Sequence, residues 1–393
     1  MDGKLDTVPS EETSTQELAV WSYRNPVDVR FGQGSFSKLG SLLNGRAYVL
    51  VTYGEAYFRS LASDLAKTAG APLLVIEDIA PNPDIALLEQ QVSRFAGIAA
   101  EPVIVALGGG SVIDSAKVFA AARGDFAGMD AYLKKRASAE TLSPWPLIAV
   151  PTTAGTGSEV TCWGTVWDNA NREKYSLAHP GLYPEFALVD PDLMIGKPRD
   201  LTIQTGLDAL SHSLESLWNR NANPVSAAHA VAAARGVLST LPALAGDLRN
   251  PQLRERMARA ATLAGFAFSN TKTAIAHSLS YPITLRHGVP HGIACSFSLP
   301  MIIRSVAGQG GICEEGLRSI FGADAAGAAE RLEITLGKLG VSTDFRSYGI
   351  GEEEWRALIE SALEGERGQN FIGSREELLA VARSEGAGRK AVA

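Results

Sequence analysis

The chain has 393 residues, more than one hydrophobic core usually supports, and this length suits two domains of about 150 to 200 residues each. Hydrophobic residues make up 46% and charged residues 20%, which is ordinary for a folded globular protein and argues against a disordered or membrane-embedded chain. A net charge of −7 provides no basic field for phosphate backbones, so we expect a small-molecule ligand and no nucleic acid partner.

The first 18 residues are polar and acidic, so they are expected to form a flexible tail and not a signal peptide. No run of about 18 apolar residues follows, so no membrane span is expected. The cysteines are odd in number and widely spaced, which favours buried, unpaired thiols in a reducing compartment. A cytoplasmic protein is therefore predicted. The three cysteines are Cys162, Cys295 and Cys313.

Short apolar runs alternate with amphipathic stretches from residue 47 to residue 150. Such alternation is typical of a parallel sheet covered by helices, so an α/β domain is predicted. The predicted strands are 47–52, 73–77, 103–107 and 147–150. The predicted helices are 56–68, 85–95 and 112–123, each with apolar residues at helical spacing.

The strand at 103–107 runs into a glycine-rich turn, Gly108-Gly109-Gly110-Ser111, and then into a helix. Glycines there allow positive φ and leave no Cβ in the way, so backbone N–H groups can approach a diphosphate at the helix N-terminus. A second loop at 151–161, PTTAGTGSEVT, also follows a strand, where open α/β sheets place their ligands. Each loop alone can be a tight connection, but the two together favour a nucleotide site.

The pattern changes after Asp190, where ALVDPDLMIGKP ends the last apolar run. We expect an N-terminal domain at 19–195 and a C-terminal domain at 196–393. Periodicity beyond residue 202 is almost wholly helical, so the second domain is predicted to be all-α. The long candidate helices are 203–219, 225–241, 251–268 and 325–339.

The helical region also contains a set of possible metal ligands. Asp208 and His212 are four residues apart and therefore project from one face of a helix. His277, His287 and His291 fall within fifteen residues, although the chain has only six histidines. Each of these residues alone is more often an ordinary core or surface side chain. Their clustering favours a nitrogen-and-oxygen site for Fe(II), Zn(II) or a similar ion.

Taken in order, GGGSVIDSAK, PTTAGTGSEVT, GLDALSHSLES and AHSLSYPITLRHGVPHG resemble the iron-containing alcohol dehydrogenase family (group III) over roughly residues 25–385. The resemblance implies an N-terminal dinucleotide-binding α/β domain and an all-α C-terminal domain, the dehydroquinate synthase-like fold. A cleft between them would hold cofactor and metal. A homodimer or a higher homo-oligomer is also expected.

The resemblance implies a role for each matching position. Hydride would pass between nicotinamide C4 and a carbonyl carbon while the metal stabilises charge on the oxygen. The matching metal ligands, for Fe²⁺ or alternatively Zn²⁺, are Asp208, His212, His277 and His291. The matching cofactor positions are Gly109, Gly110, Ser111, Asp114, Thr152, Thr153 and Lys174.

Two departures from the family pattern leave alternatives open. Much of the family has a histidine four residues after the third ligand, where this chain has Tyr281, so Tyr281, His287 or a water relayed to the ribose is the expected proton path. NAD-preferring relatives often have an aspartate at the point matching Tyr53 or Gly54. Its absence permits NADPH, which we favour over NADH, although Glu55 next door can also discriminate.

Polar residues near His277 predict the substrate class. Asn270, Lys272 and Arg286 suggest a small anionic aldehyde, as in the phosphonoacetaldehyde reductase branch that this segment resembles. Alternatives are a short-chain alcohol dehydrogenase without anionic preference, a metal-dependent lyase or hydrolase, and a non-catalytic nucleotide-binding protein. A hydrolase would not need the phosphate turn, and a non-catalytic protein would not need the four metal ligands.

Overall fold

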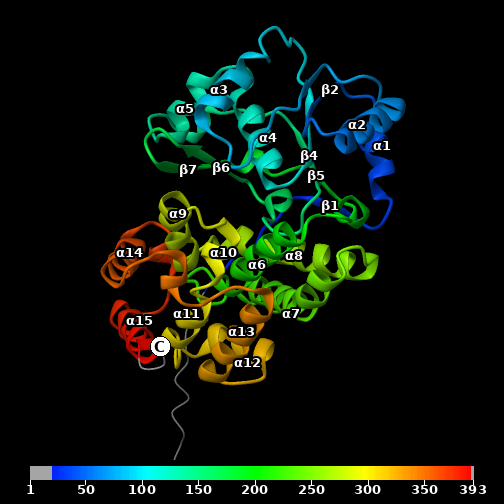
Figure 1. Cartoon of the computed structure of the whole chain (residues 1–393). Helices are drawn as coiled ribbons and strands as arrows, with labels where there is room; N and C mark the ends of the chain where they lie inside the picture. The colour runs from blue at the N-terminus through cyan, green and yellow to red at the C-terminus, as the bar shows by residue number, and fades with distance from the viewer. Residues whose placement is uncertain (1–19, 391–393) are drawn as a thin grey trace, which may run out of the picture.

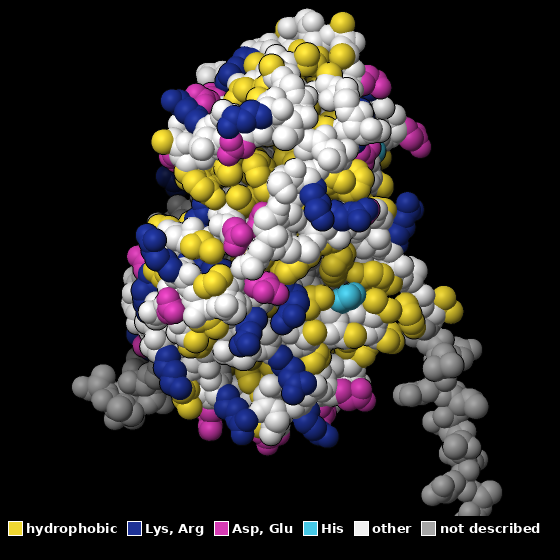
Figure 2. All heavy atoms as spheres, turned by 90° about the vertical axis from the view of Figure 1, so that its right-hand side faces the viewer, with side chains coloured by type: hydrophobic (Ala, Val, Ile, Leu, Met, Phe, Trp, Pro, Cys, Tyr) yellow, Lys and Arg dark blue, Asp and Glu magenta, His cyan; other side chains and the backbone are white. Residues whose placement is uncertain are grey.

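The computed structural model describes residues 20–390, so the predicted tail at 1–18 lies outside them. An α/β part lies above a helical part in the view of Figure 1. Within the described range, no helix has both the length and the apolar character that a membrane span requires. Basic and acidic side chains are interspersed on the face shown in Figure 2, which therefore presents no continuous basic band.

The α/β part is built on a parallel sheet of six strands in the order β1-β8-β5-β4-β2-β3. The strand order reverses at β2, because β3 pairs with one of its edges and β4 with the other. Ligands of open α/β sheets bind at the carboxyl ends of the strands at such a point. The strands are β1 (Asp28–Phe31), β2 (Tyr48–Val51), β3 (Leu74–Ile76), β4 (Val103–Gly108), β5 (Leu147–Pro151) and β8 (Phe186–Val189).

Helices cover both faces of this sheet. Alternate residues of a strand point to opposite faces, so Tyr48 and Leu50 pack on one side and Val49 and Val51 on the other. The first side is covered by α1 (Leu39–Leu43) and α2 (Ala56–Ala69). The second is covered by α3 (Ile85–Ser93), α4 (Gly110–Ala122) and α5 (Phe126–Leu133). Burial on both faces explains the continuous apolar runs of the sequence.

A β-hairpin that the sequence analysis did not predict follows the second loop. Its strands, β6 (Trp163–Asp168) and β7 (Glu173–Ala178), pair antiparallel from Trp163 with Ala178 to Asp168 with Glu173. The hairpin packs against α4 and includes Lys174.

The C-terminal part is helical throughout the described residues, so the predicted combination of an α/β part and an all-α part is confirmed. The change from strands to helices falls between β8 and α6 (Arg199–Glu215), while the limits 19–195 and 196–393 remain a prediction. Helix α6 packs against the first four of the following helices. These are α7 (Pro224–Gly246), α8 (Pro251–Thr271), α9 (Ile275–His287), α10 (His291–Ser296), α11 (Leu299–Ser305), α12 (Gly311–Phe321), α13 (Ala325–Leu339), α14 (Glu352–Glu364) and α15 (Arg375–Lys390).

The two parts meet along α8. A Cβ on Gly157 would lie 2.6 Å from the Cα of Gly265, so only glycine permits this approach of the second loop to the helix. Tyr23 Oη also donates a hydrogen bond to the carbonyl of Phe266 at 3.1 Å. The connecting 3₁₀ turns are η1 (Ser35–Lys38), η2 (Ala139–Thr141), η3 (Ser158–Val160), η4 (Pro180–Leu182), η5 (Pro191–Met194), η6 (Phe345–Tyr348) and η7 (Gly368–Asn370).

Candidate metal and cofactor site

The four predicted metal ligands lie together around one carboxylate oxygen. Asp208 and His212 project from α6, His277 from α9, and His291 is the first residue of α10. Asp208 Oδ1 lies 3.4 Å from His277 Nε2 and 3.8 Å from His291 Nε2. It lies 3.9 Å from His212 Nε2. The structure therefore brings together residues that are up to 83 positions apart in the sequence.

A glycine lets α10 reach α6. A Cβ on Gly292 would lie 1.9 Å from the carbonyl oxygen of Gln204, a distance that no other residue could accept without displacing the helix. Gln204 lies one helical turn before Asp208, and Gly292 follows His291 directly. This contact therefore places His291 beside the carboxylate.

The cluster fits a divalent metal ion. Asp208 Oδ1 and His277 Nε2 are buried and have no hydrogen-bond partner among the residues that the structure describes. Such orphaned polar atoms are costly unless something binds them. Burial alone would raise the pKa of Asp208, but the three histidines lower it overall, so the carboxylate is ionised. One carboxylate and three imidazoles form a donor set suited to iron or zinc.

Glu215 supports the cluster from behind, a role that the sequence analysis missed. Its Oε2 lies 2.6 Å from His277 Nδ1, and its Oε1 accepts hydrogen bonds from the backbone N–H groups of Ala276 at 2.5 Å and His277 at 3.1 Å. A carboxylate there holds the proton on Nδ1 and leaves Nε2 free for a metal. The signal was present in the sequence, because Glu215 lies seven residues after Asp208, two turns along the same helix face.

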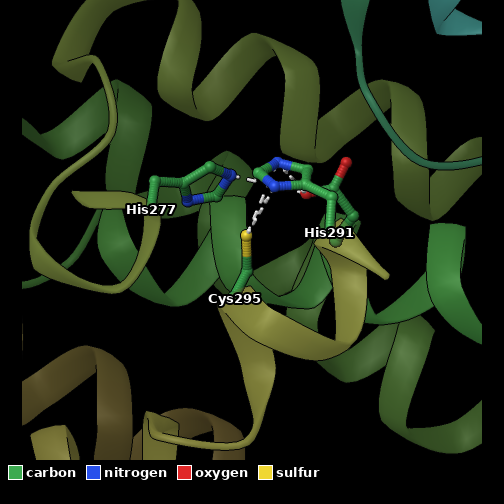
Figure 3. A group of neighbouring side chains, drawn as sticks. His277, His291 and Cys295 are labelled. Carbon is green, nitrogen blue, oxygen red and sulfur yellow. Dashed lines mark hydrogen bonds and ion pairs between the residues drawn. The ribbon is translucent and has the colours of Figure 1, made fainter. Parts of the chain in front are cut away.

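Cys295 lies at the edge of the same cluster. Figure 3 shows its thiol pointing toward the space between His277 and His291. The Sγ atom is 3.5 Å from His291 Nε2, and one donor atom from each of Asp208, His277, His291 and Cys295 lies within 4.8 Å of the others. The sequence analysis expected a buried cysteine, which it is, but did not place it beside the metal ligands.

A cavity of about 470 Å³ lies between the α/β part and the helical part and joins the two predicted sites. The metal cluster lines one region of it, and the glycine-rich turn lines another. The sequence-predicted residues that line the cavity are Gly110, Ser111, Asp114, Lys174, Asp208, His212, Lys272, His277, Tyr281 and His291.

The glycine-rich turn leads directly into α4. Its glycines leave room for neighbouring atoms and do not adopt positive φ. None of Gly108, Gly109 and Gly110 has a positive φ, so this part of the expectation was wrong. A Cβ on Gly110 would lie 2.6 Å from Thr156 Cγ2, so this glycine allows the two loops to pack together. Gly109 is the N-cap of α4, and no side chain caps the first turn. The backbone N–H groups of this first turn are therefore available to an anion.

The other predicted cofactor residues differ in their access to the cavity. Asp114 lines it, and its carboxylate accepts hydrogen bonds from Ser158 Oγ at 2.5 Å and Thr165 N at 2.9 Å. Thr153 packs against Gly109, since a Cβ there would lie 3.2 Å from Thr153 Oγ1. Thr152 is buried behind the turn. Gly109, Thr152 and Thr153 are not among the residues that line the cavity.

Tyr281 lies next to the metal cluster. Its ring stacks on that of His291, with centroids 5.7 Å apart and an angle of 7° between the planes. Lys174 Nζ lies 3.6 Å from the centre of the Tyr281 ring, and Arg367 Cζ lies 5.0 Å from it. Arg367 also lines the cavity, and no local sequence signal could have shown this, because it belongs to a turn almost 90 residues away from Tyr281.

Three residues predicted for the substrate or the proton path also do not line the cavity. The side-chain amide of Asn270 exchanges two hydrogen bonds with the backbone of Arg24. His287 Nε2 lies 3.0 Å from Glu354 Oε1, and Arg286 Nη1 lies 3.8 Å from the same oxygen. Nearness in sequence to His277 did not predict nearness in space. Tyr281, four residues after His277, shares its helix face. The last turn of α9, which carries Arg286 and His287, faces α14 instead.

Comparison with known proteins matches both halves of the chain. The model of the iron-containing alcohol dehydrogenase family matches residues 26–191, and that of the C-terminal part of the Fe-containing alcohol dehydrogenase family matches residues 202–384. The NAD-dependent methanol dehydrogenase of Bacillus methanolicus is 30% identical over 354 residues, which cover 85% of this chain and 91% of the relative.

Two further relatives are named for anionic aldehydes. The phosphonoacetaldehyde reductase of Streptomyces viridochromogenes is 36% identical over 240 residues, 59% of this chain and 60% of the relative. The crystal structure of the sulfoacetaldehyde reductase from Bifidobacterium kashiwanohense in complex with NAD⁺ superposes with a TM-score of 0.85 at 29% identity. This match covers 93% of this chain and 98% of the other.

Proposed function

The chain belongs to the iron-containing alcohol dehydrogenase family, and from this premise we propose that it reduces a small anionic aldehyde to its alcohol with NADPH or NADH. One observation carries the proposal. A single cavity contains both an uncapped helix N-terminus at Ser111 and a cluster of metal ligands at Asp208. A nicotinamide ring and a carbonyl group can therefore meet in it.

The metal ligands and their support have distinct tasks. Bound Fe²⁺, or Zn²⁺ in its place, supplies a Lewis acid that polarises the carbonyl oxygen. Asp208, His212, His277 and His291 would hold it, and Glu215 keeps His277 in the tautomer that has Nε2 free. Cys295 borders the same space.

The first turn of α4 would bind the cofactor pyrophosphate through the N–H groups of Gly110 and Ser111. We favour NADPH, because position 54 has no side chain to repel a 2′-phosphate. Arg59 Nη2 lies 3.7 Å from where its Cβ would be, although the same guanidinium pairs with Glu77 Oε1 at 2.9 Å. The Arg59→Ala variant should raise the KM for NADPH more than that for NADH. Equal effects on the two would remove this preference.

Tyr281 is the proposed proton donor. Burial raises the pKa of its phenol, but Arg367 and Lys174 outweigh this effect and lower it overall. A phenol in contact with two cations releases its proton more readily than one in water. His287, the other candidate, pairs with Glu354 and does not line the cavity, so we do not assign it this task.

Two observations support an anionic substrate. Lys174, Lys272 and Arg367 all line the cavity, and two relatives are named for phosphonoacetaldehyde and sulfoacetaldehyde. A neutral short-chain alcohol is the alternative, as in the methanol dehydrogenase relative. We further propose that the protein acts in the cytoplasm as a homodimer or higher homo-oligomer, in keeping with its free cysteines and the exposed edge strand β1.

A panel of aldehydes tests the proposal. Iron-loaded protein is mixed with NADPH or NADH and with propanal, phosphonoacetaldehyde or sulfoacetaldehyde, and loss of the reduced nicotinamide absorbance is followed. We expect turnover with at least one anionic aldehyde. Metal-loaded protein that oxidises neither cofactor with any aldehyde would refute the proposal.

A further inference from the structure

In the described part of the chain, four cationic side chains line the cavity, and two of them, Lys174 and Arg367, contact Tyr281. Neither Lys174 nor Arg367 forms an ion pair with a carboxylate within residues 20–390. Both instead contact the ring of Tyr281. Desolvation lowers the pKa of Lys174, and the charge of Arg367 adds to this effect. Two neighbouring positive charges in a partly desolvated cavity favour the binding of an anion.

Arg367 presents a free guanidinium edge. Its Nε donates a hydrogen bond to Thr273 Oγ1 at 3.1 Å, and no hydrogen bond engages its Nη1 or Nη2 among the described residues. The turn that bears it is clamped, because Asn370 Nδ2 donates to the carbonyl of Thr273 at 2.9 Å. A Cβ on Gly368 would lie 2.0 Å from the carbonyl oxygen of Ala362, so this turn packs tightly on α14. The guanidinium is thus held in place with its two terminal groups open.

Lys272, another cation of the cavity, differs from these two. Its side chain is 56% exposed, and its Nζ lies 3.7 Å from Glu366 Oε1. It therefore lies at the mouth of the cavity with its charge partly compensated. From sequence, Lys272 was predicted to bind the substrate and Lys174 the cofactor. The cavity contacts favour Arg367 and Lys174 for the substrate.

We propose that Arg367 and Lys174 form the subsite that binds the anionic group of the substrate, and this rests on the proposed function. The two terminal groups of Arg367 match two oxygens of a tetrahedral phosphonate or sulfonate, and Lys174 is available to a third. Both cations contact Tyr281, whose ring also stacks on that of the candidate metal ligand His291. Tyr281 thus lies in contact with both the proposed subsite and the metal cluster.

The ratio of kcat/KM for phosphonoacetaldehyde to kcat/KM for propanal tests the subsite. In Arg367→Met this ratio should fall by about 100-fold, the loss expected for a bidentate bond to a charged group, and mainly through the KM of the anionic aldehyde. Arg367→Lys should recover part of it. The matched control, Lys135→Gln, removes a charge from an exposed lysine that also lines the cavity and should change the ratio less than about threefold.

Sulfoacetaldehyde, measured in parallel, shows whether phosphonate or sulfonate is preferred. The subsite would be overturned if Arg367→Met left the ratio unaltered for both anionic aldehydes. It would also be overturned if the wild-type enzyme reduced propanal but neither anionic aldehyde.

Calorimetric titration with phosphonoacetate, whose carboxylate does not accept hydride from a reduced nicotinamide, keeps the test independent of turnover. We expect Arg367→Met to weaken its binding by about 100-fold. Equal affinities would overturn the subsite. If wild-type protein reduces no aldehyde but this difference in binding is found, the proposed function fails and the anion subsite stands.

Discussion

Oε2 of Glu215 lies 2.6 Å from Nδ1 of His277, and both groups are fully buried. The same carboxylate accepts hydrogen bonds from two backbone N–H groups at the start of α9. It therefore fixes the backbone and the ring of a metal ligand together, and directs Nε2 toward Asp208. Metal affinity should depend on a residue that does not itself touch the metal.

Glu215→Gln should lower metal affinity by about 10 to 100-fold, because an amide does not stabilise the Nδ1–H tautomer as a carboxylate does. Competition with a chelator for Zn²⁺ or Co²⁺ measures this loss. Glu354→Gln is the control, since it alters a second histidine–glutamate pair that lies outside the cavity. Equal affinities of Glu215→Gln and wild type would contradict this account of Glu215.

Metal binding should stabilise the fold. The residues that would hold the metal come from three helices, so the ion should bind only the folded state. Binding of this kind adds about 2.7 kcal/mol to the free energy of unfolding when the free metal concentration is 100 times its Kd. Differential scanning calorimetry should show a lower Tm after chelation of the wild-type protein and a smaller response in Asp208→Asn. A wild-type Tm that does not change with added metal would argue against a metal site at Asp208.

Gly292→Ala should destabilise the protein by about 1 to 3 kcal/mol or more and weaken metal binding. The new methyl group would meet the carbonyl of Gln204 and push α10, with His291, away from α6. Gly337→Ala is the matched helical control, because nothing lies within 4 Å of its Cβ. That variant should gain about 0.5 to 1 kcal/mol. Denaturant unfolding measures the change in the free energy of unfolding for each variant. Similar changes in the two variants would show that the close contact at Gly292 has no effect on stability.

Lys117 should make stability rise with pH. It is fully buried in α4, and its Nζ donates hydrogen bonds to the carbonyls of Ser158 and Trp163 at 2.7 and 2.6 Å. Burial lowers its pKa to about 8, which Asp114 opposes. Above this pH the unfolded state holds more protons than the folded state, so the free energy of unfolding increases up to the ordinary lysine pKa.

The free energy of unfolding of the wild type minus that of Lys117→Met should therefore rise by about 2 kcal/mol from pH 7.5 to pH 9.5. Urea unfolding of the two proteins at both pH values measures it. A difference that stays constant would show that Lys117 keeps its proton across this range.

Helices and strands were predictable from the sequence where a local residue pattern determines their bounds. The helix expected at 325–339 is α13 at the same bounds, because its apolar residues are regularly spaced between Asp324, which caps it, and Gly340. The hairpin β6–β7 was missed, since its turn has no strong glycine or proline signal and Lys174 interrupts its apolar pattern. Lys117 is buried through contacts with Ser158 and Trp163, and such tertiary contacts leave no local pattern in the sequence.

The grouping of the four candidate metal ligands was predictable because their residue types and spacing are distinctive. Asp208 and His212 share a helix face, and the resemblance to a family supplied the other two ligands. The substrate side was harder, because Arg367 reaches Tyr281 through tertiary contacts that leave no periodic or local pattern. Arg286, by contrast, is close to His277 in sequence and yet pairs with Glu354.

Transfer of deuterium to the aldehyde carbonyl carbon, from reduced cofactor that carries two deuterium atoms at nicotinamide C4, tests the central claim most directly. The iron-loaded wild-type protein should yield an alcohol with one deuterium on that carbon. His277→Ala, with its fold verified by circular dichroism, should lose both bound metal and this transfer. Unlabelled alcohol from the wild type, or undiminished transfer in a metal-free His277→Ala variant, would contradict a metal-dependent reductase.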